Sequence, residues 1–174
     1  SIVYLADADG SETDGDGSQS SPYQNIQTAL DNVADGGIIR LVGDVTYTKY
    51  KTHTDGSALP LIINKNVIIE GASGKSPLAS DADSFSLRAP IQLDANVTFR
   101  NIKLELIPET TLGKASSNNG VLGEVKPLAA TIFVAGNTLT LDNVNTKVGT
   151  SANQSFQRPY ISGGSFKGVG NVGS

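Results

Sequence analysis

Alternation of apolar and polar residues dominates the chain from residue 38 onwards and predicts a series of short β-strands. The apolar-rich runs cover residues 38–42, 61–69, 91–106, 132–148 and 160–172. Within them every second residue tends to be apolar, as in a strand that buries one face. A further run at residues 2–5 predicts one more short strand at the start of the chain.

A single helix is predicted between the first strand and this series. Ser21 is a candidate N-cap, Pro22 suits the first helical position, and Gln24 completes a capping box. The residues that would form its apolar face are Tyr23, Ile26, Ala29, Leu30 and Val33. Asp-Gly-Gly at residues 35–37 predicts its end.

The strands repeat a five-residue phrase, found at 67–71, 97–101 and 139–143, with a weaker copy at 164–168. The first and third positions of the three clear copies are apolar, and the fifth is Gly or Asn in all four. Gly and Asn enter the left-handed backbone region at the lowest cost, so the chain is predicted to bend there. Copies at variable spacing predict a solenoid with loop insertions.

The fourth position of the phrase reads Glu70, Arg100, Asp142 and Lys167, with alternating charge. If the strands stack in parallel register, these side chains lie about 4.8 Å apart and each attracts its neighbour. The alternative is an antiparallel sandwich of hairpins. That arrangement normally shows Asn-Gly or Asp-Gly two-residue turns between adjacent strands, and the sequence lacks them there.

Residues 4–47 resemble the opening of pectate-lyase-like proteins, the right-handed parallel β-helix family. The similar features are the acidic Gly-rich loop, the segment Ser-Pro-Tyr-Gln-Asn-Ile at 21–26 and Asp-Gly-Gly at 35–37. Residues 161–168 resemble coils of large bacterial surface proteins with that fold. The resemblance implies an all-β domain, a right-handed parallel β-helix with an N-terminal amphipathic capping helix.

The same resemblance implies that residues 1–174 form a single β-helix domain or the N-terminal fragment of one. Residues 1–37 would form its capping strand, loop and helix, and residues 38–174 its coils. An uncovered last coil would leave an open strand edge. We therefore expect that the native protein continues past Ser174 or that a second copy covers this edge.

Composition narrows the classes of function. Only 17% of the 174 residues are charged and the net charge is −4, so the basic face of a nucleic-acid binder is not expected. No apolar run is long enough for membrane insertion. The absence of cysteine excludes disulfides, thiolate zinc sites and a cysteine nucleophile.

The acidic loop between the first strand and the helix is a candidate metal site. Asp7, Asp9, Asp14 and Asp16 offer the hard oxygen ligands that Ca²⁺ prefers. The pattern is not a full EF-hand, because Ser18 stands where the bidentate Glu is required. The alternative is a solvated turn, and no cofactor is required by any other motif.

Candidate ligand-binding residues lie near the loop that follows residue 47. Tyr47 and Tyr50 are predicted to be exposed and could stack on sugar rings. His53, the sole histidine, lies in the same loop; the alternative is an exposed histidine without a role, since no motif supplies a catalytic partner.

These observations favour an extracellular bacterial module that presents a surface for adhesion or carbohydrate contact and is not catalytic as it stands. Loop insertions at 72–90, 107–131 and 147–159 would form that surface, and its partner would be a polysaccharide or a cell-surface glycan. Two alternatives remain: a fragment of a polysaccharide lyase or glycoside hydrolase whose active site lies on later coils or on these loops, and a structural spacer.

Overall fold

The computed structural model describes most of the chain. The described residues are 1–7, 15–47, 61–72, 74–87, 91–106, 131–146, 160–162 and 164–173. They form one helix, α1 (Ile26–Asn32), and the strands β1 (Ile2–Leu5), β2 (Ile38–Leu41), β3 (Val45–Tyr47), β4 (Leu61–Ile63), β5 (Val67–Gly71), β6 (Ser84–Leu87), β7 (Ile91–Leu93), β8 (Val97–Leu106), β9 (Thr131–Phe133), β10 (Thr138–Asn145), β11 (Tyr160–Ser162) and β12 (Ser165–Gly173).

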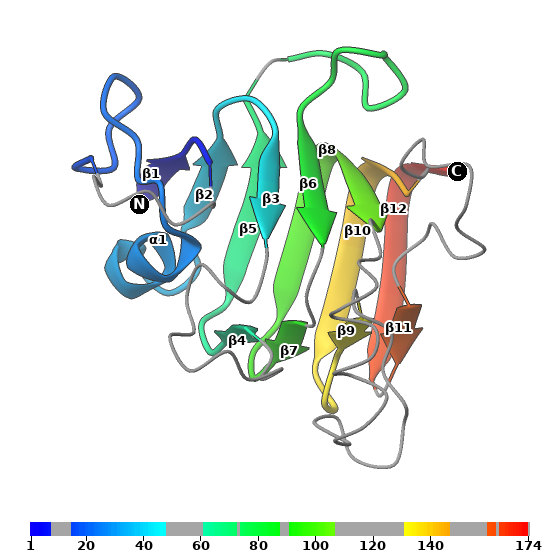
Figure 1. Cartoon of the computed structure of the whole chain (residues 1–174). Helices are drawn as coiled ribbons and strands as arrows, with labels where there is room; N and C mark the ends of the chain where they lie inside the picture. Colours follow the sequence, from blue (N-terminus) through cyan, green and yellow to red (C-terminus); the bar gives the residue numbers. More distant parts are fainter. Residues whose placement is uncertain are drawn as a thin grey trace, which may run out of the picture.

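The strands form two parallel sheets (Figure 1). The large sheet has eight strands, with the order β1-β2-β5-β8-β10-β12, and β6 and β3 extend it beside the second half of β8. The small sheet has the order β11-β9-β7-β4. Each strand of the small sheet comes directly before a strand of the large one in the sequence, so the chain alternates between the two.

This arrangement corrects the fold expected from the sequence, a closed right-handed parallel β-helix. Eight strands belong to one large sheet, because β8 and β10 continue through their bends without leaving it. No closed solenoid is found in the described residues, which carry one short helix. The repeated phrase specifies pairing and register, whereas closure depends on connections such as 88–90, 107–130 and 147–159, which lie outside the described part.

The apolar positions of the repeated phrase form the core, as predicted. Val67 pairs with Val97, which pairs with Leu139 on its other side, and all three are at most 3% exposed. Phe99 is fully buried and meets Phe85 edge to face, with 5.6 Å between the ring centroids. Phe85 lies on β6, a strand inside the segment 72–90 that the sequence analysis assigned to a loop.

The helix begins later than predicted. Its N-cap is Asn25, whose side chain accepts a hydrogen bond from the Gln27 amide at 2.9 Å, and not Ser21. Tyr23 is extended instead, because its backbone pairs with β1: its N–H donates to Tyr4 and its carbonyl accepts from Ala6. The predicted apolar face is confirmed, since Ile26, Ala29, Leu30, Val33 and Tyr23 are all buried.

Polar side chains fix the starts of β5, β8 and β10. Asp35 Oδ1 accepts from the Asn66 amide, Asn66 Oδ1 from the Asn96 amide, and Asn96 Oδ1 from the Thr138 amide, each at 2.9 Å. We call Asp35, Asn66 and Asn96 the strand-start ladder. The sequence analysis missed it, although Asn precedes the first phrase residue at both Val67 and Val97.

Candidate functional site

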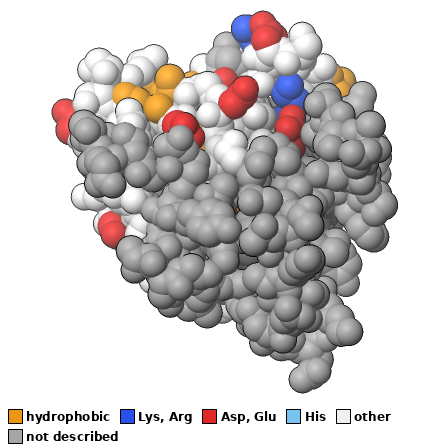
Figure 2. All heavy atoms as spheres, viewed as in Figure 1, with side chains coloured by type: hydrophobic (Ala, Val, Ile, Leu, Met, Phe, Trp, Pro, Cys, Tyr) orange, Lys and Arg blue, Asp and Glu red, His pale blue; other side chains and the backbone are white. Residues whose placement is uncertain are grey.

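A hollow of about 190 Å³ lies where the large sheet bends, between the end of β5, the bends of β8 and β10, and the start of the segment 74–83. Its walls are made of Gly71, Gly74, Lys75, Ser76, Asn101 and Asn143. Two asparagines, a lysine, a serine and two glycines give it polar walls with little side-chain bulk. Acidic and basic side chains mingle at the end of the molecule where 74–83 lies (Figure 2).

One wall of the hollow is a pair of asparagines on adjacent strands. Asn101 and Asn143 have φ angles of 55° and 53°, the left-handed conformation predicted at the fifth phrase position. Asn143 Nδ2 donates to Asn101 Oδ1 at 2.8 Å. Within the described residues, this bond leaves the Asn101 Nδ2 amino group and the Asn143 Oδ1 oxygen without another partner, so both can contact a ligand.

Gly71 occupies the corresponding place on β5, and it contributes backbone alone to the wall of the hollow. A Cβ atom on Gly71 would lie 2.5 Å from the backbone oxygen of Asn101 and 3.1 Å from Ile102 Cγ2. Gly71 is not among the residues with positive φ, so the left-handed bend predicted for it is wrong. Glycine is required here by the close approach of the two strands, because neighbouring atoms occupy the space that a side chain would take.

The opposite wall is the segment 74–83, which long-range bonds hold against the sheet. Asp83 Oδ2 accepts from the Ala72 amide at 2.9 Å, and Lys103 Nζ donates to the Ser80 carbonyl at 3.0 Å. Asn145, which is buried, donates from Nδ2 to the Pro77 carbonyl at 3.2 Å. The wall therefore belongs to the folded structure although it contains little secondary structure.

The charges of this wall are paired. Lys75 Nζ lies 2.6 Å from Asp81 Oδ2 on the surface. Their hydrogen bond raises the pKa of Lys75 and lowers the pKa of Asp81, so both groups are charged at neutral pH. This exposed pair brings one cation and one anion together, which suits a neutral polar ligand better than a highly charged one.

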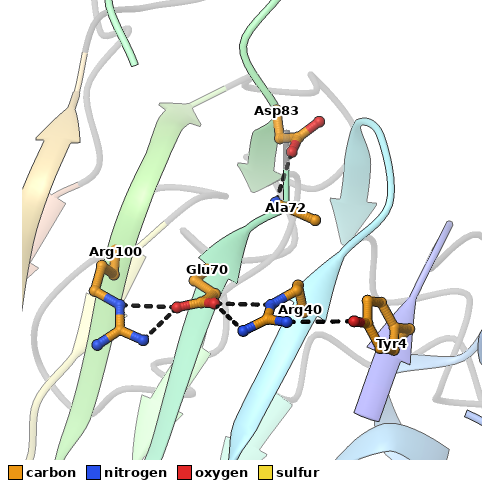
Figure 3. Close-up of polar contacts among 6 residues, drawn as sticks. All are labelled: Tyr4, Arg40, Glu70, Ala72, Asp83 and Arg100. Carbon is orange, nitrogen blue, oxygen red and sulfur yellow. Dashed lines mark hydrogen bonds and ion pairs between the residues drawn. The ribbon is translucent and has the colours of Figure 1, made fainter. Parts of the chain in front are cut away.

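A charged row crosses the outer face of the large sheet beside this site (Figure 3). Glu70 Oε2 accepts from Arg40 Nε and Glu70 Oε1 from Arg100 Nε, each at 2.8 Å. Arg100 Nη2 also donates to Oε1, and Arg40 Nη1 donates to the Tyr4 hydroxyl at 3.2 Å. Because guanidinium groups occupy both oxygens of the buried Glu70, this carboxylate ties strands together and does not face a ligand.

The register confirms part of the predicted charge column. Glu70 pairs with Arg100, and Arg100 with Asp142. Lys167 pairs with Thr140 and not with Asp142, so the fourth copy of the phrase is shifted by two residues from the predicted register. Arg40, which pairs with Glu70 on the other side, belongs to the row and was missed.

A second polar group lies where β3, β6 and β8 run side by side. Asp44 Oδ1 accepts from the amide and the hydroxyl of Ser84, at 3.2 and 3.0 Å. Burial raises the pKa of Glu105, and the negative charge of Asp44 adds to this, while Lys103 and Ser86 oppose it. The carboxylate of Asp44 is engaged by its own strand neighbours, so this group supports the sheet.

The predicted ligand-binding residues near position 47 are only partly placed. Tyr47 is fully buried, because it pairs with Leu87 of β6 and faces the core, so the prediction that it is exposed for sugar stacking is wrong. Tyr50 and His53 lie outside the described residues.

Two of the four predicted calcium ligands are described. Asp16 Oδ1 accepts from the amide and the hydroxyl of Ser18, at 2.9 and 2.6 Å, and these bonds lower the pKa of Asp16. Asp7 precedes the undescribed segment that contains Asp9 and Asp14. Among the described residues, no three His, Asp or Glu side chains gather as a metal site would need. The calcium site stays a prediction.

No known protein family matches the chain, and neither curated proteins nor solved structures show significant similarity to it. Within the described ranges, none of the helical structure has the length and apolar character that a membrane crossing demands. The candidate site is therefore judged on its own geometry.

Lys75 and Ser76 were missed as site residues. They belong to no motif, and they reach the hollow only because bonds from Asp83 and Asn145 fold their segment onto the bend. Asn101 and Asn143 carried a signal, since Asn recurs at one position of the phrase, but the sequence analysis assigned them only a backbone role.

Proposed function

We propose that this protein contacts carbohydrate at the hollow between Asn101, Gly71 and Lys75, without catalysing a reaction. The observation that carries the proposal is the asparagine pair in the wall of the hollow, whose mutual bond leaves Asn101 Nδ2 without another partner among the described residues. A sugar ring brings hydroxyl groups that both donate and accept hydrogen bonds. The amide, ammonium and hydroxyl groups that line the hollow can meet both kinds.

The size and shape of the hollow suit contact with a single sugar unit, while the rest of the polysaccharide stays outside. The hollow of about 190 Å³ is smaller than the pockets of roughly 300–1,000 Å³ that enclose drug-sized ligands. Gly74 leaves its backbone open to a flat ring face, since no atom lies within 4 Å of the place that a Cβ atom would take. A shallow contact of this kind gives weak binding at one site, which is typical of adhesion surfaces that act through many copies.

The absence of catalysis in this proposal follows from how the nearby carboxylates are used. Glu70 is held between two arginines, Asp81 by Lys75, and Asp83 by the Ala72 amide. Glycoside hydrolysis needs two carboxyls facing one scissile bond. We propose that the protein acts outside a bacterial cell, where polysaccharides and surface glycans are displayed.

The test is a glycan array, followed by calorimetry with the bound glycan, on the protein and two variants. Asn101→Gly keeps a residue that tolerates φ near 55° and removes the amide; Lys75→Gln keeps the asparagine pair and removes the charge. We expect each to weaken binding about tenfold, the equivalent of one lost hydrogen bond of about 1.4 kcal/mol.

The matched control is Gln27→Ala, which removes an exposed amide from α1, away from the hollow. It should bind like the unchanged protein. Equal binding by Asn101→Gly and the unchanged protein, or no binding to any glycan, would contradict the proposal. Release of sugar fragments during incubation would contradict its non-catalytic part.

A further inference from the structure

The asparagine pair in the wall of the hollow has hydrogen-bonding groups of both kinds to offer. Asn143 Nδ2 donates to Asn101 Oδ1, and within the described residues Asn101 Nδ2 and Asn143 Oδ1 have no further partner. If oxygen and nitrogen were exchanged in both side chains, the bond would run the other way and one donor and one acceptor would again be left. Both residues line the hollow, so a ligand there meets amide groups.

The pair is a short stack of side-chain amides that ends at Asn101. Asn101 and Asn143 hold the same position of the repeated phrase, and their φ angles of 55° and 53° make the two side chains project alike. The same position on β5 is Gly71, which has no amide to add. In such a stack each amide gives a hydrogen bond to one neighbour and takes one from the other. A carbonyl oxygen of a ligand amide therefore suits the donor that Asn101 leaves over.

The ion pair beside the hollow favours a neutral group on the ligand. Lys75 lines the hollow, and its Nζ lies 2.6 Å from Asp81 Oδ2. A ligand amine would bring a second ammonium group close to Lys75, and a ligand carboxylate would bring a second carboxylate close to Asp81. An amide does neither, and it still supplies a strong acceptor oxygen and a donor N–H.

An exposed apolar side chain lies in the turn that starts at the hollow. The Leu78 amide donates to Ser76 Oγ at 3.2 Å, and the Ala79 amide donates to the Ser76 carbonyl at 2.9 Å. Ser76 lines the hollow, and Leu78, two residues further on, is 59% exposed. An acetamido group ends in a methyl group, which is stabilised by apolar contact, whereas a hydroxyl group has no such atom.

We propose that the hollow selects a sugar unit that carries an acetamido group, an N-acetylhexosamine, over the same sugar with a hydroxyl or a free amine in that place. The acetamido carbonyl accepts a hydrogen bond from Asn101 Nδ2, and the methyl group packs against Leu78. The inference rests on the proposed carbohydrate contact, and it narrows the partner to one class of glycan.

The experiment compares matched glycans by calorimetry on the unchanged protein. The probes are short oligosaccharides of N-acetylglucosamine and of N-acetylgalactosamine, each beside its hydroxyl and its amine counterpart, in mildly acidic buffer that keeps the amine charged. We expect at least one acetamido glycan to bind about tenfold more tightly than its hydroxyl counterpart, and the amine to bind most weakly. Glycan binding without this preference would overturn the inference and leave the proposed function standing, whereas no glycan binding at all would overturn both.

A variant of the stack tests the assigned contact. Asn101→Asp tolerates a left-handed backbone, still accepts from Asn143 Nδ2, and replaces the donor by a carboxylate oxygen. It should bind the acetamido glycan about tenfold more weakly and the amine counterpart more tightly than the unchanged protein does. Gln27→Glu, the same change of amide to carboxylate on the exposed face of α1, should keep the original order.

A second variant decides the question if Asn101→Asp fails to fold. Leu78→Ala shortens an exposed side chain and should weaken binding of the acetamido glycan about threefold without affecting its hydroxyl counterpart. An Asn101→Asp variant that folds and keeps the preference for acetamido glycans, or a Leu78→Ala variant with unchanged binding, would overturn the proposal.

Discussion

The path β1-β2-β5-β8-β10-β12 of the large sheet has two ends, which we call the head (β1) and the tail (β12), and the described residues treat them differently. A parallel sheet built from a repeated phrase has no natural limit, because every added strand exposes an edge like the one it covered. At the head, the sheet is ended by a group of elements outside the repeat, namely residues 17–23, α1 and Lys65. At the tail, no such device lies within the described residues. Ending a repetitive sheet therefore takes residues outside the repeat.

The head half is also tied more firmly across its strands. Tyr4, Arg40, Glu70 and Arg100 form a continuous row of hydrogen bonds over β1, β2, β5 and β8. The row stops there. Asp142 pairs with Arg100 in register, but no ion pair joins these two side chains. The following experiments test how much each end owes to its own contacts.

The largest effect is expected at Glu70. Glu70→Gln leaves two guanidinium groups beside each other without their shared carboxylate. Removing one partner of a buried ion pair costs about 3–5 kcal/mol, and partial exposure of the arginines reduces this to about 2–3 kcal/mol. Urea unfolding measures the change. Asp81→Asn, in an exposed pair, should leave the stability nearly unchanged; equal losses in both variants would show that the row does not tie the head.

A smaller loss is expected when the helix end loses its lysine. Lys65→Met keeps the length of the side chain and removes the donor to the carbonyls of Leu30, Asp31 and Val33. We expect a loss of about 1–2 kcal/mol in the free energy of unfolding, together with faster hydrogen exchange in α1. Lys167→Met at the tail is the control. Unchanged exchange in α1 would show that Lys65 does not cap the head.

A gain in stability is expected near the tail. Ala135, between β9 and β10, has a φ of 53°, which costs an alanine roughly 1–2 kcal/mol. Ala135→Gly should therefore stabilise the protein by about 0.5–1 kcal/mol after the entropy cost of glycine. Ala95→Gly in the connection between β7 and β8, where φ is not positive, should destabilise it. Thermal unfolding shows whether each variant gains or loses stability. A loss of stability in both variants would argue against strain at Ala135.

The smallest effect is the pH dependence of stability that comes from Glu105, which lies on β8 between the two ends of the sheet. Burial raises the pKa of Glu105 above its ordinary value of 4.5. The folded state therefore holds this proton more tightly, and stability falls as pH rises from 4.5 through the folded-state pKa. Glu105→Gln should remove this fall and stabilise the protein slightly at neutral pH. Urea unfolding in acid and at neutral pH measures the free energy of unfolding. If it falls equally with rising pH in the unchanged protein and in Glu105→Gln, the prediction is wrong.

The strands and their pairing could be predicted where the phrase is apolar and regular. Val67, Val97 and Leu139 align as expected, because a shift by one residue would expose their buried face. The copy at 164–168 was placed in the wrong register: it starts with Gly164, and the residue that pairs with Leu139 is Phe166. The helix start was wrong because Tyr23 gains two backbone bonds to β1, which a local capping pattern does not reveal.

The candidate site was less predictable than the strands. The left-handed conformation of Asn101 and Asn143 followed from the recurrence of Asn at one position. Lys75 and Ser76 depend on contacts between residues far apart in the chain, such as the bond from Asn145 to Pro77. Tyr47 was taken for a loop residue because a three-residue strand such as β3 carries too little alternation to be recognised.

The strand-start ladder has a consequence for how such a chain can change in length. Its bonds join residues that lie 31, 30 and 42 positions apart, although the geometry of each bond is the same. These side-chain oxygens thus set where a strand begins regardless of how many residues precede it. Insertions between the ladder members can lengthen the surface segments, at a slowly growing entropy cost, while the sheet beneath keeps its alignment.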